Sequence, residues 1–268
     1  LKKVFLWIVI LALTGYVLLC TAMYFGQESL LFHPKKIEKN TVLAFSRPAE
    51  EHFIVSGADT LHGLLFKADS SRGLIFYLHG NAGALDTWGK AYEFYVEQGY
   101  DFFILDYPGF GKSSGSIHSE EQIHTSVAAA YDELCKYYRQ VDITLVGYSI
   151  GTGPAARLAS VKQPARLLLQ APYYSITDLA IKEYPFIPEA LLKYPLPTFE
   201  WLPKIKCPVH IFHGDVDEII PYEHAKRLEK LFKKGDSLHT LQGATHNGMN
   251  DLKSYRTIVK ELLKPSDC

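Results

Sequence analysis

The sequence ITLVGYSIG, from Ile143 to Gly151, decides the fold class of this chain. Its first four residues favour a short buried strand, and the small residues that follow, such as Gly153 and Ala155, favour the start of a helix. Between them, the pattern Gly-x-Ser-x-Gly places Ser149 at a strand-to-helix turn, the setting of a nucleophile elbow. Small neighbours are needed because an elbow strains the backbone of its serine. A glycine-rich turn that only packs a helix on a sheet is the alternative.

Short apolar runs recur on both sides of this stretch. They do not alternate with polar residues and each is too short for a helix, which is typical of strands covered on both faces. The runs are Leu74–Leu78, Phe102–Leu105, Ile143–Val146, Leu167–Leu169 and Val209–Phe212. A final strand-like run, Leu238–Leu241, follows them. Helical patterns lie between and after them: from the capping box of Ser119 and Gln122 to Tyr138, after Pro221, and from about Asp251 to Pro265. The sequence therefore predicts a mostly parallel, doubly covered α/β sheet, entered through a hairpin at 53–56 and 60–67.

Composition sets limits on function. The chain has 268 residues, of which 47% are hydrophobic and 21% charged, so it can form one large globular domain. Its formal net charge of −1 offers no excess of positive charge for a phosphate backbone, and we expect no nucleic-acid partner. The cysteines show no C-x-x-C spacing that would predict a zinc or redox site; they are Cys20, Cys135, Cys207 and Cys268.

The first residues differ in character from the rest. Residues 4–25 carry no charge and follow Lys2 and Lys3. As a helix they would rise about 33 Å, enough to cross a hydrocarbon core of about 30 Å. We therefore expect a single-pass membrane anchor at residues 1–26 and the α/β domain at 27–268. A signal peptide cleaved after Ala22, which would make the protein secreted, and a buried core helix are the alternatives.

The flanking charges bear on membrane orientation. Lys2 and Lys3 lie directly against the apolar run, whereas the other flank meets Glu28 first and its lysines only later. This asymmetry favours a cytosolic N-terminus and an extracytoplasmic domain.

A serine hydroxyl is a poor nucleophile at neutral pH, so Ser149 needs a base that a carboxylate orients. After such an elbow the acid and then the histidine follow along the chain. His246 lies in a loop after the last strand-like run, where its imidazole can face the elbow, and it is the candidate base. The other downstream histidines fall in predicted strands, a turn or a helix: His210, His213, His224 and His239.

The acid should follow the predicted strand Val209–Phe212. Three carboxylates there qualify by chemistry: Asp215, Asp217 and Glu218. Their crowding beside His213 also suggests a metal cluster, but no further ligands stand at a recognisable spacing. We therefore predict neither a metal nor a cofactor.

The loop His79-Gly80-Asn81-Ala82-Gly83 follows the first of the parallel strands. Backbone N–H groups there can meet the oxyanion that develops on an attacked carbonyl, together with the N–H that follows the nucleophile. We expect Asn81 and Ile150 to supply these two donors. A plain glycine turn is the alternative.

Together these motifs resemble the α/β-hydrolase superfamily, and within it the single-pass, membrane-anchored ABHD-type serine hydrolases. The resemblance covers nearly the whole chain and implies the α/β-hydrolase fold, Ser149 as nucleophile and His246 as base. The family pattern D-x-x-[VI]-P selects Asp217 over Asp215 as the acid, and Asp106 resembles a position that buttresses the loop after its strand. The matching stretches are FGQESLLFHP (25–34), HGNAG (79–83), LDYPGFGKS (105–113), GYSIG (147–151), HGDVDEIIP (213–221) and GATH (243–246).

The segment 174–206 reads as a short cap insert above the nucleophile. It is rich in proline and aromatic residues, which favours an acyl chain or another hydrophobic group as substrate, unless these rings only pack on the body. We expect a hydrolase of carboxylic esters or thioesters acting on small-molecule acyl or lipid-like substrates. A serine peptidase or amidase with the same triad, and a non-catalytic scaffold, are the alternatives. The sequence leaves the physiological substrate and the oligomeric state open.

Overall fold

The computed structural model describes residues 1–264, so Cys268 and the expected helix end at Pro265 lie outside the described residues. The strands are β1 (His33–Pro34), β2 (Glu50–Ser56), β3 (Asp59–Phe66), β4 (Leu74–Leu78), β5 (Ala82–Gly83), β6 (Asp101–Leu105), β7 (Ile143–Tyr148), β8 (Arg166–Gln170), β9 (Val209–Gly214) and β10 (Ser237–Leu241). The helices are α1 (Lys2–Leu31), α2 (Leu85–Trp88), α3 (Tyr92–Glu97), α4 (Glu120–Leu134), α5 (Thr152–Val161), α6 (Ile176–Glu183), α7 (Thr198–Trp201), α8 (Glu223–Glu229) and α9 (Lys253–Leu262).

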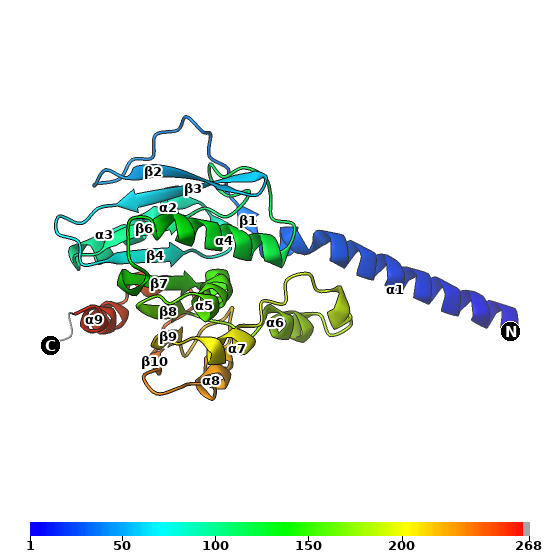
Figure 1. The fold of residues 1–268 in the computed structure, drawn as a ribbon. Coiled ribbons are helices and arrows are strands. Elements are labelled where there is room, and N and C mark those ends of the chain that lie inside the picture. Colours follow the sequence, from blue (N-terminus) through cyan, green and yellow to red (C-terminus); the bar gives the residue numbers. More distant parts are fainter. Residues whose placement is uncertain (265–268) are drawn as a thin grey trace.

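A central sheet has the strand order β10-β9-β8-β7-β4-β6-β3-β2 (Figure 1). The strands from β10 to β6 in this order run parallel, and β3 and β2 join antiparallel as a hairpin. Strands β1 and β5 form a separate parallel pair. The expected parallel α/β sheet with an antiparallel entry is confirmed, and most strands extend slightly beyond their apolar runs.

Two hydrophobic cores explain why the central strands are apolar throughout. In β4, Leu74, Phe76 and Leu78 face one core, whereas Ile75 and Tyr77 face the other. Side chains of α4, α5 and α8 complete the first core, and side chains of α2, α3 and α9 complete the second. Helices on both faces therefore bury every side chain of a central strand, which removes the alternation of polar and apolar residues.

Helix α4 begins at the expected cap but ends early. The Ser119 hydroxyl accepts a hydrogen bond from the Gln122 N–H at 3.1 Å. The Gln122 side chain accepts from the His118 N–H at 2.9 Å instead of returning to Ser119, so only half of the expected capping box forms. Tyr138, expected on this helix, lies beyond its last residue, Leu134.

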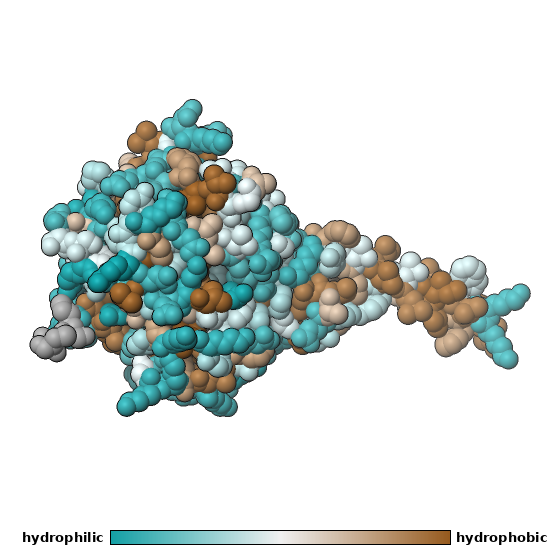
Figure 2. All heavy atoms as spheres, viewed as in Figure 1, coloured by the Kyte–Doolittle hydropathy of each residue, from teal (hydrophilic) through white to brown (hydrophobic). Residues whose placement is uncertain are grey.

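Helix α1 projects from one edge of the body and exposes brown, apolar side chains along its length (Figures 1 and 2). Its 30 residues are long and apolar enough to cross a membrane. The helix continues five residues past the expected boundary at residue 26. The reason is its last turn, where the Gln27 side chain donates to the Leu191 carbonyl and accepts from the Lys193 N–H, both at 2.8 Å.

The cap insert, residues 174–206, packs largely on the body. Tyr194 and Trp201 are buried in the first core, and Tyr174 stacks on Phe199 with ring centroids 4.6 Å apart. Tyr184 and Phe186 remain exposed, and Tyr16 of α1 donates a hydrogen bond to the Phe186 carbonyl. Packing on the body therefore accounts for most of these rings without a substrate.

Candidate active site

Ser149 lies at a strained turn between β7 and α5. Its φ of +53° is in the left-handed region, where side chains other than glycine are uncommon. The flanking glycines allow the turn to pack tightly: a Cβ on Gly147 would lie 2.6 Å from the Gly151 carbonyl oxygen. A Cβ on Gly151 would lie 2.3 Å from the Leu78 carbonyl oxygen. The Gly-x-Ser-x-Gly pattern is thus dictated by backbone contacts on both sides of the serine.

Three side chains from distant parts of the chain meet at this turn. The Ser149 Oγ lies 3.0 Å from His246 Nε2, and His246 Nδ1 lies 2.9 Å from Asp217 Oδ2. All three residues are buried. An ionised carboxylate only accepts hydrogen bonds, so Nδ1 carries the imidazole proton and leaves the Nε2 lone pair to accept from the serine hydroxyl. The sequence candidates for nucleophile, base and acid therefore form one hydrogen-bonded chain.

The Asp217 carboxylate is held in its ionised form. Burial by itself would raise the pKa of Asp217, but hydrogen bonds from His213 and His246 and from the Ile220 N–H outweigh it and lower this pKa well below its usual range. Its other oxygen, Oδ1, accepts from the N–H groups of Ile219 and Ile220 at 2.9 and 2.8 Å. These backbone donors fix which carboxylate oxygen faces the imidazole.

The two neighbouring acids have other partners. Asp215 Oδ1 accepts from the Gly243 N–H at 2.7 Å, and Glu218 Oε2 accepts from the His246 backbone N–H at 3.2 Å. Both carboxylates therefore hold the loop that carries His246, and Asp217 alone of the three bonds to the imidazole ring.

Two residues at the site received no catalytic role in the sequence analysis. Tyr148 donates its hydroxyl to the His246 carbonyl, and burial raises the pKa of this phenol, which keeps it protonated. His213, expected to begin a turn, is instead buried in β9, where its Nε2 lies 2.8 Å from the Ile220 carbonyl oxygen and 3.4 Å from Asp217 Oδ2. The only available signal was adjacency: Tyr148 precedes the nucleophile, and His213 opens the loop that holds the acid.

The loop of the first expected oxyanion donor begins against the elbow: a Cβ on Gly151 would lie 2.7 Å from the His79 carbonyl oxygen. Ile150 follows Ser149 in a short 3-10 turn of residues 149–151. Asn81 lies between the end of β4 and β5, and its backbone N–H has no backbone acceptor within residues 1–264. The Asn81 side chain is engaged elsewhere, because its amide donates to the Leu31 carbonyl at 3.0 Å.

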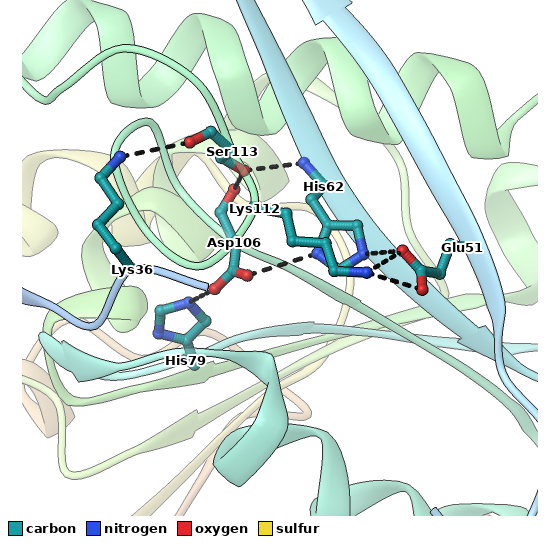
Figure 3. Close-up of polar contacts among 7 residues, drawn as sticks. All are labelled: Lys36, Glu51, His62, His79, Asp106, Lys112 and Ser113. Carbon is teal, nitrogen blue, oxygen red and sulfur yellow. Dashed lines mark hydrogen bonds and ion pairs between the residues drawn. The ribbon is translucent and has the colours of Figure 1, made fainter. Parts of the chain in front are cut away.

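Asp106 lies behind this loop, fully buried at the end of β6 (Figure 3). Its two oxygens lie 3.5 Å from His79 Nε2 and 3.6 Å from His62 Nδ1. His62 in turn contacts Glu51, which also forms an ion pair with Lys112 at 2.7 Å. The carboxylate thus lies directly against the first residue of the 79–83 loop. It also packs on Gly111, where a Cβ would lie 1.9 Å from Oδ2, in the loop after its own strand that the resemblance implied it buttresses.

No group of three or more His, Cys, Asp or Glu side chains within residues 1–264 is arranged to hold a metal ion.

We expect Gly151→Ala to destabilise the fold and to impair the site. The new methyl group would lie 2.3 Å from the Leu78 carbonyl oxygen and 2.7 Å from that of His79, and backbone atoms move less readily than side-chain ends. Overpacking of this kind costs about 1–3 kcal/mol, which thermal unfolding in detergent would show as a lower midpoint. Gly26→Ala, with no heavy atom within 4 Å of its Cβ, is the control. Equal stability of both variants would contradict the packing described here.

The fold and the site together define a class of protein. A family model described as "alpha/beta hydrolase fold" matches residues 73–172, from β4 to the end of β8. Among solved structures, an esterase of Pyrococcus furiosus superposes with a TM-score of 0.70 at 19% identity, covering 87% of this chain and 96% of that chain. Est1E from Butyrivibrio proteoclasticus superposes with a TM-score of 0.64 at 20% identity, covering 80% of this chain and 99% of that chain. The chain therefore has the α/β-hydrolase fold.

The chain also has relatives that share a higher sequence identity with it than these solved structures do. The chain is similar to alpha/beta hydrolase domain-containing protein 17C of Mus musculus, with 29% identity over 222 residues, 80% of this chain and 67% of the relative. It has the same identity to the Homo sapiens protein of that name, over 65% of its length. The 17B protein of Xenopus laevis is 29% identical over 72% of this chain and 67% of its own length. The chain thus spans about two thirds of the length of these relatives.

Proposed function

We propose that this protein is a serine hydrolase that cleaves carboxylic esters or thioesters through an acyl-enzyme. Ser149 Oγ attacks the acyl carbon while His246 Nε2 takes the hydroxyl proton. The backbone N–H groups of Asn81 and Ile150 stabilise the oxyanion. His246 then gives the proton to the leaving alkoxide or thiolate, and water attacks the acyl-enzyme with His246 again as base, which releases the acid and restores Ser149.

One observation carries this proposal: the hydrogen-bonded chain from Ser149 through His246 to Asp217, with the serine at a φ of +53°. A structural serine does not require a strained backbone conformation, an imidazole at 3.0 Å and an ionised carboxylate behind that imidazole. Strain of this kind persists where the surrounding structure enforces it, and such positions cluster at active sites. The esterases among the structural neighbours support the fold on which this chemistry occurs.

An active-site-directed fluorophosphonate tests the proposal against a non-catalytic scaffold. The full chain should be labelled on Ser149, and heat-unfolded protein should not, because labelling needs the assembled imidazole and carboxylate. Matched esters, thioesters and amides of rising acyl length then define the leaving group and the acyl preference. Turnover of amides above esters would replace the esterase proposal by a peptidase or amidase.

The substrate proposed is a small molecule with an acyl or lipid-like group. The position of α1 supports it, since a hydrolase held at a bilayer meets acyl chains there. The exposed cap rings Tyr184 and Phe186 lie on the side of the cap that contacts α1, because Tyr16 bonds to the Phe186 carbonyl. Most other cap rings are packed on the body and contribute nothing to this inference.

We propose that α1 anchors the protein in a membrane, with the hydrolase domain on the extracytoplasmic side. Its exposed apolar surface has no cover among the described residues, and a bilayer would bury it. The charge asymmetry of Lys2 and Lys3 against Glu28 supports the orientation.

A chain that starts at Gln27 should remain in solution without detergent and should hydrolyse a short soluble ester with kcat within about twofold of the full chain. The shortened chain keeps Gln27, whose side chain bonds to the cap, and removes no residue of the site. The full chain should sediment with membranes and resist extraction by carbonate, because a spanning helix is held by hydrophobic burial. The mass of the mature protein is the deciding control: an N-terminus at Met23 would show cleavage after Ala22 and exclude an anchor.

A further inference from the structure

The segment that leaves the anchor helix runs alongside the oxyanion loop and pairs with it. We name residues 31–35 the strap and residues 79–83 the oxyanion loop. The chain turns from helix to extended conformation at Phe32, with φ −122° and ψ 127°. His33 and Pro34 then form β1, which pairs in parallel with Ala82 and Gly83 of the oxyanion loop.

The strap contacts Asn81 at two points. The His33 N–H donates to the Asn81 carbonyl at 2.8 Å, and the Asn81 side-chain amide donates to the Leu31 carbonyl at 3.0 Å. A third bond runs from the Lys35 N–H to the Gly83 carbonyl at 2.9 Å. Fixing both the side chain and the carbonyl of Asn81 restricts the rotation of its backbone, and hence the direction of its own N–H. That N–H is the donor assigned above to the oxyanion.

The strap is itself held from the other side. Gly111 donates its N–H to the Lys35 carbonyl at 2.9 Å and accepts from the Ile37 N–H at 3.0 Å. Gly111 packs on the buried Asp106 carboxylate, where even a Cβ would lie 1.9 Å from Oδ2. Lys36 extends along the same loop toward the Ser113 carbonyl (Figure 3). The strap is thus bonded both to the oxyanion loop and to Gly111, which packs on Asp106.

The helix end that precedes the strap is fastened to the cap. Phe32 is buried and packs edge-on against Tyr194, with ring centroids 5.3 Å apart. Glu28 accepts from the Tyr194 hydroxyl at 2.8 Å and pairs with Lys193 at 3.0 Å. The cap insert and the oxyanion loop are therefore both joined to residues 27–35, at the end of the anchor helix.

We propose that the strap is a positioning element of the active site, which aims the Asn81 N–H at the developing oxyanion. The proposal rests on the proposed serine-hydrolase function. A misaimed donor weakens binding of the transition state more than binding of the substrate, so loss of the strap should lower kcat and leave KM nearly unchanged. The catalytic geometry of this protein would then depend on the junction between its anchor and its domain.

The test compares His33→Pro with His33→Ala in the full chain. Proline removes the N–H that bonds to Asn81, and Phe32 already has the extended conformation that a residue before proline adopts. Alanine keeps that N–H, and the His33 side chain it removes is exposed. We expect kcat for a soluble ester to fall at least about tenfold in His33→Pro, with KM within about threefold, and to stay within twofold in His33→Ala.

Asn81→Ala is the second variant, and it decides alone if His33→Pro does not fold. This variant keeps the Asn81 N–H and removes only the side-chain bond to the Leu31 carbonyl. If the Asn81 N–H needs no support from the strap, kcat should equal that of wild type. If the strap aims this N–H, kcat should fall as it does in His33→Pro. A well-folded variant with kcat within twofold of wild type, or with a change confined to KM, would overturn the proposal.

Hydrogen exchange separates this proposal from the function on which it rests. In a Ser149→Ala background, His33→Pro should speed amide exchange in residues 79–83 relative to His33→Ala, and unchanged exchange would show that the strap does not hold the loop. If the wild-type chain shows no Ser149-dependent hydrolysis, the proposed function fails, and the exchange result still decides whether the strap orders the loop.

Discussion

Ser149→Ala is expected to lower kcat for an activated acyl ester by roughly 10³-fold or more, which corresponds to at least about 4 kcal/mol of transition-state stabilisation. Without Oγ no acyl-enzyme can form, and only the oxyanion donors and substrate binding remain. The loss should appear in kcat and not mainly in KM, because the hydroxyl acts on the reacting carbon.

Stability should change little in this variant. Alanine keeps the Cβ that already lies at a φ of +53°, and the lost hydroxyl bonds through Oγ only to the His246 ring among the described residues. Unfolding midpoints of wild type and variant should therefore agree within a few degrees. Ser160→Ala on α5, which removes a bond to the Arg157 carbonyl far from the site chemistry, is the matched control and should keep full activity. Ester turnover by well-folded Ser149→Ala at the wild-type rate would exclude the serine mechanism and leave the scaffold alternative.

The sheet was predictable because a strand that is buried on both faces has apolar residues at every position. Strands such as β4 are apolar at every position, since their side chains alternate between two cores. The elbow was predictable for a different reason: Gly147 and Gly151 are required by close backbone contacts, and such glycines occur at fixed positions relative to the serine. Both signals depend on the residues of one short segment.

No comparable sequence pattern predicted the strap, residues 31–35. Strand β1 has two residues, and its bonds to the oxyanion loop use mostly backbone atoms of His33 and Lys35, which any residue except proline provides. Its partner strand, β5, lies about fifty residues further along the chain, so no local sequence pattern predicts the pairing. The FGQESLLFHP stretch was noted as a likeness to a family, without a structural role.

Most of the cap rings carry no information about the substrate, for a related reason. Aromatic residues serve equally well to pack a core and to line a site, and their number does not distinguish the two. Tyr194 and Trp201 pack in the core, and the pair Tyr174 and Phe199 stack on each other. The sequence likewise places His213 at the start of a turn, whereas in the structure this residue is in β9 and its Nε2 lies 3.4 Å from Asp217 Oδ2.

Asp217→Asn is expected to lower kcat by roughly 10³- to 10⁴-fold, and the structure gives the reason. Oδ1 accepts two backbone N–H bonds, from Ile219 and Ile220, so the oxygen of an asparagine amide would occupy that place. Its NH₂ group would then face His246 Nδ1, where a carboxylate oxygen now accepts at 2.9 Å. Two donors would oppose each other, and the imidazole could avoid this only by moving its proton to Nε2, which removes the base from Ser149.

Two neighbouring carboxylates provide matched controls for this variant. Asp215 accepts a single N–H, from Gly243, and Glu218 accepts one from the His246 backbone, and the amide oxygens of Asp215→Asn and Glu218→Gln can accept the same bonds. Each control should therefore lose less than about tenfold in kcat, because it only loosens the loop. Rates for the three variants on one ester, with unfolding midpoints for each, make the comparison. The order of the losses in kcat decides the assignment. A larger loss in Asp215→Asn than in Asp217→Asn would identify Asp215 as the catalytic acid.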